Sequence, residues 1–391
     1  MTPPARTQAA IELVDAIVAS AREGGAAADT LIARYFSARR YAGSKDRRAV
    51  RELVYAAVRH AGDIPPSGRA AVLALADADP TLAASFDGSA HGPAPFTDGE
   101  PRASGGAAPA WLANLLARSG VDPITLLGRA PLDVRVNRLK ATPDAMLGEL
   151  PDAQLCPYAP EGLRLPPGTN VETLPAFREG RVEVQDEGSQ LVGLALGAQP
   201  GQHIVDLCAG AGGKSLALAA AVGNEGTILA CDVDRTRLSR LAPRAARAGA
   251  TMIETRLLDP QREAEAMADW NARADAVLVD APCTGTGTWR RNPEARWRLT
   301  PARLERLAAT QAHVLDVAAP LVRPGGLLVY VVCSLLDREG ADQIDTFLAR
   351  HSGWTIEPPA LPCGERHGQG ARLTPGLCGT DGFFVARARR A

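Results

Sequence analysis

The spacing of apolar residues divides the chain into a helical first part and a later part in which strands and helices alternate. Between about residues 5 and 85, apolar side chains recur three or four positions apart, as at Leu13, Val14 and Ile17, which predicts amphipathic helices. From about Gly188 onward, short apolar runs alternate with segments rich in Ala and Leu. This alternation predicts units of one strand followed by one helix.

The apolar runs of the later part are nearly continuous, as parallel strands buried on both faces require. The predicted strands cover 203–207, 227–232, 276–280, 327–332 and 383–386. Helices are predicted between them, over 215–222 and 235–248. The fold class that follows is α/β, a doubly wound Rossmann-like sheet that binds its ligands at the carboxyl ends of its strands.

Changes of composition along the chain predict four segments. Residues 1–86 form an all-α domain, and residues 87–108, rich in Gly, Pro, Ser and Ala, form a linker. Residues 109–187 combine a short helix with the alternating pattern of strands and form a small α+β module. Residues 188–391 form the sheet domain.

The composition is that of an ordinary soluble protein. Apolar residues make up 46% of the 391 residues and charged residues 22%, and the net charge is −1. No run of about eighteen uncharged apolar residues occurs, so no membrane span is predicted. The first residues lead into an amphipathic helix rather than an apolar signal sequence, and we therefore expect a cytoplasmic protein, and a monomer.

The cysteines are odd in number, scattered and without C-x-x-C spacing. They are Cys156, Cys208, Cys231, Cys283, Cys333, Cys363 and Cys378. This pattern argues against a zinc site, so that no metal is expected, and against a disulfide framework. Basic clusters at 34–51, 290–298 and 387–390 fit either contacts to phosphates or solvated helix faces.

A glycine-rich loop follows the first strand of the sheet domain and leads into a helix. The loop reads Asp206-Leu207-Cys208-Ala209-Gly210-Ala211-Gly212-Gly213-Lys214, which lacks the spacing of a Walker loop but allows a ligand to approach the main chain. Asp232, about twenty residues further on, ends the next strand, where an acid accepts hydrogen bonds from ribose hydroxyls. Asp259 follows a third strand, where it can meet an adenine. Either acid alone fits a helix cap equally well, but their regular placement favours a nucleotide site.

Two cysteines stand at the predicted ends of buried strands, fifty residues apart. Cys283 lies in the sequence Asp-Ala-Pro-Cys-Thr-Gly that begins at Asp280, and Cys333 lies in Val-Val-Cys-Ser. A thiolate that adds to a pyrimidine ring makes the neighbouring ring carbon nucleophilic enough to accept a methyl group. Either cysteine alone can equally be a small buried apolar residue. As a pair beside a glycine-rich loop, they indicate covalent chemistry on a base.

Together these motifs resemble the RNA 5-methylcytosine methyltransferases of the Fmu/Sun/nucleolar-protein (RsmB-like) family. The matching stretches are 184–190, the loop through Lys214, 280–285, Cys333-Ser334 and 380–386. The resemblance covers about residues 109–391. More weakly, the first helices resemble the NusB-like RNA-binding domain of members that modify small-subunit ribosomal RNA. The loop reads Ala-Gly-Ala-Gly-Gly-Lys where many members have Ala-Ala-Pro-Gly-Gly-Lys.

The resemblance implies a class I methyltransferase that uses S-adenosylmethionine to methylate carbon 5 of cytosine in RNA, with ribosomal RNA favoured over transfer RNA. It implies that Cys333 is the nucleophile and that Cys283 assists release of the product. The residues that would line the cofactor and base pocket are Cys208, Ala209, Gly210, Ala211, Gly212, Gly213, Lys214, Asp232, Asp259 and Asp280.

Three further expectations concern this site. Asp280 is expected to bond the ring edge at nitrogen 3, which requires a proton on either the carboxyl group or the ring. Arg290, Arg291 and Arg298 are expected to hold flanking phosphates, unless they belong to a solvated helix face. DNA cytosine methyltransferases place the attacking thiol on the Pro-Cys motif, so Cys283 stays an alternative nucleophile.

Three other classes of protein fit part of the pattern. A small-molecule methyltransferase is disfavoured by the paired thiols and the basic helical domain. A non-catalytic RNA-binding or ribosome-assembly protein would not need both thiols, Asp280 and the whole loop. A Rossmann dehydrogenase would need a hydride-transfer acid or a substrate-clamping arginine, and neither is recognisable near Asp280.

Overall fold

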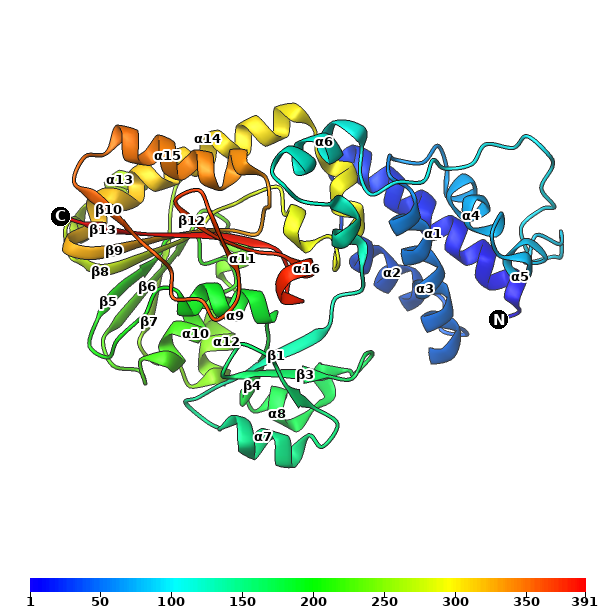
Figure 1. Ribbon diagram of the computed structural model, residues 1–391. Coiled ribbons are helices and arrows are strands. Elements are labelled where there is room, and N and C mark those ends of the chain that lie inside the picture. Colours follow the sequence, from blue (N-terminus) through cyan, green and yellow to red (C-terminus); the bar gives the residue numbers. More distant parts are fainter. The chain divides into compact units, whose positions relative to one another are not determined.

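Helices make up one of the two units into which the computed structural model, which describes residues 1–391, divides. This helical unit contains residues 1–129 together with residues 288–301, and the sheet unit contains residues 130–287 and 302–391. The α-helices of the helical unit, labelled in Figure 1, are α1 (Pro3–Glu23), α2 (Ala28–Ser37), α3 (Ser44–His60), α4 (Gly68–Ala76), α5 (Pro80–Ala83) and α6 (Ala110–Arg118). The unit also contains the 3-10 turns η1 (Pro123–Leu127) and η5 (Pro293–Arg298). The division of the chain into four segments at residues 86, 108 and 187 stays a prediction.

Local sequence sets both ends of α1. The Thr2 hydroxyl accepts a hydrogen bond from the backbone N–H of Ala5 at 3.4 Å, and proline occupies the first helical position, where its missing N–H costs nothing. Gly24, with a φ of 71°, ends the helix. Leu13 and Ile17 are fully buried in the core of the unit, which confirms the helix predicted from their spacing.

Two segments without long helices also pack in the helical unit. Arg296, in η5, is fully buried and donates to the backbone carbonyls of Val58 at 2.6 Å and Ala61 at 2.8 Å. In the segment predicted to be a linker, Ala103 is buried, and its N–H donates to the carbonyl of Ala70 at 3.0 Å. This part of the predicted linker is therefore folded against the helices, because its small residues fit close to them.

The sheet unit begins with a small antiparallel sheet in the order β2-β3-β1-β4. Its elements are β1 (Leu132–Val136), α7 (Pro143–Glu149), β2 (Gln154–Leu155), β3 (Gly162–Leu165), η2 (Val171–Thr173), α8 (Pro175–Arg178) and β4 (Val182–Val184). Val134, Leu163 and Val182 are fully buried between the strands and the helices. The alternating pattern of residues 133–137 is thus confirmed as a strand.

The second sheet has the order β11-β12-β13-β9-β8-β5-β6-β7, and β10 pairs with β13. Its strands are β5 (His203–Asp206), β6 (Thr227–Asp232), β7 (Ile253–Leu257), β8 (Ala274–Asp280), β9 (Val322–Val332), β10 (Trp354–Glu357), β11 (Glu365–His367), β12 (Gly370–Leu373) and β13 (Phe383–Arg390). The five strands from β9 to β7 run parallel, whereas β13 and the strands beyond it are antiparallel.

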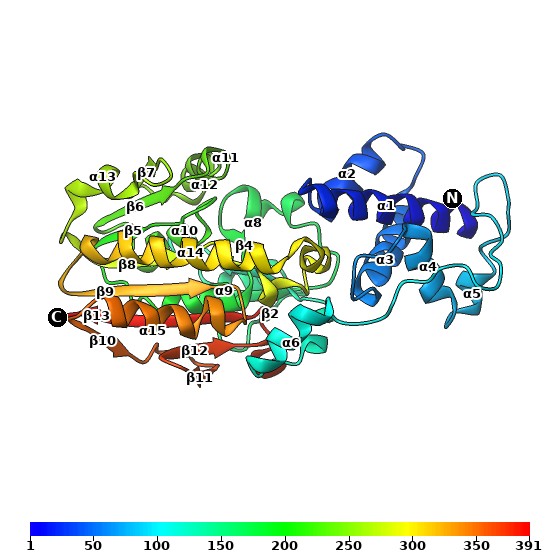
Figure 2. The ribbon, with the colours of Figure 1, turned by 90° about the horizontal axis from the view of Figure 1, so that it is seen from above.

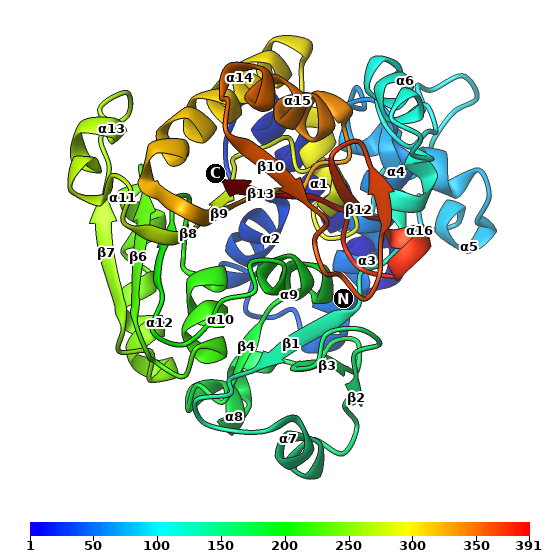
Figure 3. The same cartoon turned by 60° about the vertical axis from the view of Figure 1, so that its left-hand side comes forward.

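Helices cover both faces of this sheet. Besides α7 and α8, the α-helices of the sheet unit are α9 (Glu187–Leu194), α10 (Gly213–Ala221), α11 (Arg235–Leu238), α12 (Leu241–Ala248), α13 (Glu263–Ala266), α14 (Pro301–Ala318), α15 (Ala341–Arg350) and α16 (Pro375–Cys378). The 3-10 turns are η3 (Ala268–Trp270), η4 (Thr286–Thr288), η6 (Ala319–Leu321) and η7 (Asp337–Glu339). Figure 2 and Figure 3 show α14 and α15 on one face and α9, α10 and α12 on the other.

Two hydrophobic cores, one on each side of the sheet, complete the three layers. Leu191 and Leu216 belong to the first core, and Leu315 and Phe347 belong to the second. This arrangement confirms the predicted doubly wound α/β fold. The predicted helix 235–248 is interrupted between α11 and α12, because Pro243 lacks an N–H and is tolerated only in the first turn of a new helix.

The cysteine pattern predicts no disulfide framework, and for one pair this prediction is wrong. The structure joins Cys363 and Cys378 by a disulfide, with their Cα atoms 6.0 Å apart. The pair is fifteen residues apart in sequence, and the hairpin of β11 and β12 turns the chain back between them. Spacing in the sequence does not reveal that the chain turns back in this way.

The sequence also predicts no membrane span, and no helix of the structure combines the length and hydropathy needed to span a bilayer.

Candidate active site

The two predicted site cysteines lie next to each other because their strands are neighbours. Asp280, the last residue of β8, pairs in parallel with Val331 of β9. Both strands therefore end at the same edge of the sheet, and the loops after them carry Cys283 and Cys333. Their Sγ atoms are 3.4 Å apart, close enough for one thiol to donate a hydrogen bond to the other sulfur. The sequence places each thiol at a strand end but does not show that the two strands are adjacent.

The two thiols have unequal surroundings. The hydrogen bond with Cys333 and burial raise the pKa of the Cys283 thiol well above its usual range, and the charges of Cys333 and Glu339 raise it further. Cys283 is thus held as a neutral thiol. A thiol in this state donates a hydrogen bond and is not the attacking thiolate.

Lys214 and Asp280 form an ion pair at the same edge of the sheet. The Lys214 Nζ lies 2.6 Å from Asp280 Oδ2, and the lysine side chain is 9% exposed, whereas the aspartate side chain is 32% exposed. Burial lowers the pKa of Lys214, but the charge of Asp280 and the hydrogen bond to it raise the pKa more, as does the charge of Cys333. The ammonium therefore stays charged and interacts favourably with a thiolate at Cys333.

The loop between β5 and α10 presents its main chain to a ligand. Gly210 and Gly212 have φ angles of 56° and 82°, in the left-handed region that favours glycine. A Cβ on Gly213 would meet no atom within 4 Å, so the start of α10 is open at this point. The Asp232 carboxylate, at the end of β6, accepts from the N–H of Gly210 at 2.7 Å and holds the loop in place.

A buried carboxylate at the start of this loop has one oxygen without a partner. Asp206 Oδ2 accepts from the Ser215 hydroxyl at 2.6 Å, whereas Oδ1 has no hydrogen-bond partner. A ligand with an amino group would satisfy that oxygen. The orphaned oxygen, the open main chain at Gly213 and the acid at Asp232 together fit S-adenosylmethionine, which carries an amino group and a ribose.

The pH dependence of stability should reveal the state of Asp206. Burial raises its pKa from 3.8 to about 7, so the folded protein binds this proton more tightly than the unfolded chain. The contribution of this proton to the free energy of unfolding is fully present below pH 4 and is lost as the pH rises through 7. Asp206→Asn, which cannot ionise, should therefore gain about 2–4 kcal/mol over the wild type between pH 4 and pH 8. Chemical denaturation across this range measures the difference, and parallel stability curves for the two proteins would contradict it.

The structure also shows a buried polar cluster that the sequence does not indicate. Thr284 and Ser334, each directly after one site cysteine, both donate from their hydroxyls to Glu339, which is fully buried. Glu339 lies in a short run of charged residues that reads as solvated. No pattern in the sequence marks it as a member of the site.

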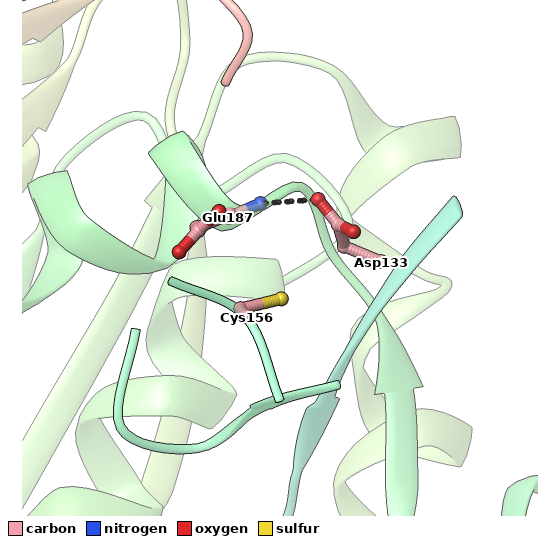
Figure 4. Close-up of side chains that lie close together, drawn as sticks. All are labelled: Asp133, Cys156 and Glu187. Atoms are coloured by element: carbon pink, nitrogen blue, oxygen red, sulfur yellow. Dashed lines mark hydrogen bonds between the residues drawn. The ribbon is translucent and has the colours of Figure 1, made fainter. Parts of the chain in front are cut away.

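A second group of acids with a cysteine lies away from the thiols, in the small sheet. Figure 4 shows Asp133, Cys156 and Glu187 close together, with the Glu187 N–H donating to Asp133 at 3.3 Å. The Arg164 guanidinium lies 2.8 Å from Asp133 and 3.2 Å from Glu187 and supplies the positive charge that both carboxylates need. Burial raises the pKa of the Cys156 thiol. The group therefore joins the small sheet to α9 as an ion-pair cluster.

The remaining predicted site residues lie apart from the thiols or in the helical unit. Asp259 follows β7 and is exposed, and its adenine contact stays a prediction. Arg298 donates to the carbonyls of Gly25 and Ala26, both at 2.7 Å, within the helical unit. Arg290 donates to the carbonyl of Arg129 at 3.1 Å. The phosphate contacts proposed for Arg290, Arg291 and Arg298 likewise stay a prediction.

Comparison with known proteins gives consistent results. The family model described as 16S rRNA methyltransferase RsmB/F matches residues 193–389. Ribosomal RNA small subunit methyltransferase B of Salmonella heidelberg (strain SL476) is 38% identical over 265 residues, which cover 66% of this chain and 59% of that protein. The protein of the same name from Salmonella enteritidis PT4 gives the same values. The chain thus spans less than two thirds of these relatives.

Solved structures extend the similarity to the whole chain. The crystal structure of PH0851 is 25% identical and covers all of both chains, with a TM-score of 0.80. That of NSun6 from Pyrococcus horikoshii with SFG is 21% identical, covers 72% of this chain and 94% of that chain, and has a TM-score of 0.62. The second likeness concerns the fold alone.

Proposed function

The chain belongs to the RsmB/F family of 16S rRNA methyltransferases, and from this premise we propose that it methylates carbon 5 of a cytosine in RNA. The donor is S-adenosylmethionine, and small-subunit ribosomal RNA is the favoured target. The observation that carries the proposal is the pair of thiols 3.4 Å apart beside the ion pair of Lys214 and Asp280. A methyltransferase acting on an exocyclic amino group needs no thiol, whereas one acting on a pyrimidine carbon needs a nucleophile that activates the ring.

The glycine-rich loop and the acids after β5 and β6 would hold the donor. Gly213 offers open main chain, Asp232 offers acceptor oxygens to ribose hydroxyls, and Asp206 offers its unpartnered oxygen to the amino group. When bound, S-adenosylmethionine supplies an electrophilic methyl group on a sulfonium.

The two thiols take different parts in the reaction. Cys333, whose charge as a thiolate interacts with the Lys214 ammonium, adds to carbon 6 of a cytosine that has left its stack, and carbon 5 becomes nucleophilic. After methylation, water accepts the proton that leaves carbon 5, and Cys283, held as a neutral thiol, lies close enough to donate a hydrogen bond to the departing Cys333 sulfur. Loss of that proton expels the Cys333 sulfur and restores the aromatic ring.

Asp280 faces the ring edge as an acceptor in this mechanism. Its carboxylate accepts from the Lys214 ammonium, so we assign the hydrogen in the bond to nitrogen 3 to the ring rather than to the carboxyl group. The bond stabilises the positive charge on the protonated ring, which makes carbon 6 more open to attack by the thiolate. Lys214 thus interacts with both the Asp280 carboxylate and the attacking sulfur of Cys333.

Methyl transfer to defined RNAs tests the proposal. Purified protein, S-adenosylmethionine and small-subunit ribosomal RNA from a strain that lacks the gene should yield one new cytosine that resists bisulfite conversion. Transfer to transfer RNA instead would keep the chemistry and change the target. Tight RNA binding without any methyl transfer, and no heat of binding for S-adenosylmethionine, would favour a non-catalytic ribosome-assembly factor and overturn the proposal.

A further inference from the structure

A buried carboxylate connects the loops that carry the two thiols. Glu339 Oε1 accepts from the backbone N–H of Thr284 at 2.8 Å and from the side-chain amide of Gln311 at 3.0 Å. Glu339 Oε2 accepts from the hydroxyls of Thr284 and Ser334. The carboxylate is fully buried, and each of its oxygens has two donors.

The cluster continues around this carboxylate on both loops. The Thr286 hydroxyl lies 3.1 Å from the Ser334 hydroxyl and accepts from the N–H of Leu335 at 2.8 Å. The Gln311 amide that reaches Glu339 also donates to the carbonyl of Pro282 at 2.9 Å. Residues directly after Cys283 and Cys333 are therefore tied to Glu339 itself, and the residue before Cys283 is tied to it through Gln311.

The cost of burying a carboxylate indicates that Glu339 does more than fill space in the core. The four donors to Glu339 are neutral, and an ionised carboxylate is costly to bury unless its oxygens are fully hydrogen bonded. An apolar side chain at this position would avoid that cost, but the loops that carry Cys283 and Cys333 would then share no hydrogen-bond acceptor. Networks of this kind fix a single geometry when every member is satisfied.

We propose that Glu339 is a positioning residue that fixes the two thiols relative to each other through Thr284 and Ser334. The inference rests on the proposed function, since it assigns Glu339 a part in the same reaction. The negative charge of Glu339 has a second effect, because it adds to the causes that raise the pKa of Cys283 and keep that thiol protonated. Glu339 thus supports the division of roles between the two cysteines.

The test uses Glu339→Gln in the full chain, with one readout that needs neither RNA nor S-adenosylmethionine. Phenylarsine oxide, a trivalent arsenical, bonds two thiols at once and reports whether Cys283 and Cys333 are held together. Its affinity should fall about tenfold or more in Glu339→Gln, because charged-acceptor hydrogen bonds to both loops are lost. The rate of methyl transfer should fall as well, with an unchanged KM for S-adenosylmethionine. Cys283→Ala and Cys333→Ala identify the arsenical site.

Two further variants separate positioning from stability. Glu187→Gln changes another fully buried carboxylate of the sheet unit, away from the thiols, and should keep wild-type arsenical affinity even where it lowers the melting temperature. Thr284→Val removes one donor to Glu339 and should weaken arsenical binding in the same direction if Glu339→Gln does not fold. Wild-type arsenical affinity in Glu339→Gln or, failing that, in Thr284→Val would overturn the inference. If the wild type methylates no RNA, the proposed function fails, and the arsenical readout alone decides the role of Glu339.

Discussion

Cys333→Ala is expected to abolish methyl transfer, and Cys283→Ala is expected to trap the RNA on the protein. Without the Cys333 thiol no adduct forms, so the rate should fall on the order of 10⁴-fold or more. Without Cys283, the adduct of Cys333 forms but its release is slow, since no thiol lies 3.4 Å away to donate a hydrogen bond to the departing Cys333 sulfur. A denaturing gel with labelled RNA should show a shifted band for Cys283→Ala and none for Cys333→Ala.

The assignment of the two thiols depends on which variant traps the RNA. A shifted band in Cys333→Ala, with none in Cys283→Ala, would make Cys283 the nucleophile, as in the DNA enzymes. Cys156→Ala is a matched control, because Cys156 is also a buried free thiol of the sheet unit but directly follows β2 of the small sheet. It should methylate at the wild-type rate without a shifted band. A variant without both Cys283 and Cys333 that still methylates normally would refute covalent catalysis altogether.

The sequence predicts the sheet and the residues at its ligand-binding edge well, for a physical reason. Strands such as 276–280 and 327–332 are apolar on both faces, and only a sheet covered by helices on both sides accepts such runs. Residues directly after those strands must then lie at one edge. The positions of the glycine loop and of Asp232 could be predicted for the same reason, because the loop directly follows β5 and Asp232 is the last residue of β6.

Contacts between distant segments could not be predicted in this way. Glu339 joins residues from three separate stretches of chain, and the run Asp-Arg-Glu in which it lies resembles a solvated turn. The disulfide of Cys363 and Cys378 depends on a hairpin that brings residues fifteen positions apart together. Arg298 reads as a phosphate ligand in a basic cluster, yet its guanidinium donates to two backbone carbonyls. In each case the environment of the side chain depends on a contact partner from another segment of the chain, and the residue itself does not reveal that partner.

The ion pair of Lys214 and Asp280 gives the second large expected effect. Asp280→Asn should lower the rate of methyl transfer by about 10²–10³-fold, because a neutral amide stabilises the protonated ring poorly. Lys214→Met should have an effect at least as large, since it leaves the carboxylate unpaired and removes the cation that interacts with the charge of Cys333. Single-turnover methylation measures both rates, and calorimetry checks that S-adenosylmethionine still binds.

The double variant decides whether the two side chains act as one unit. Residues that act together are strongly non-additive, so the variant with both changes should be no slower than Lys214→Met alone. Rate losses that multiply would show that the pair acts as two independent groups and would contradict a shared role. Lys140→Met is a matched control, because its ammonium donates to the backbone carbonyls of Glu179 at 2.9 Å and Arg247 at 2.6 Å rather than to a carboxylate. It should keep the wild-type rate, since the loss of a surface ammonium leaves the charge balance between Asp280 and Cys333 unchanged.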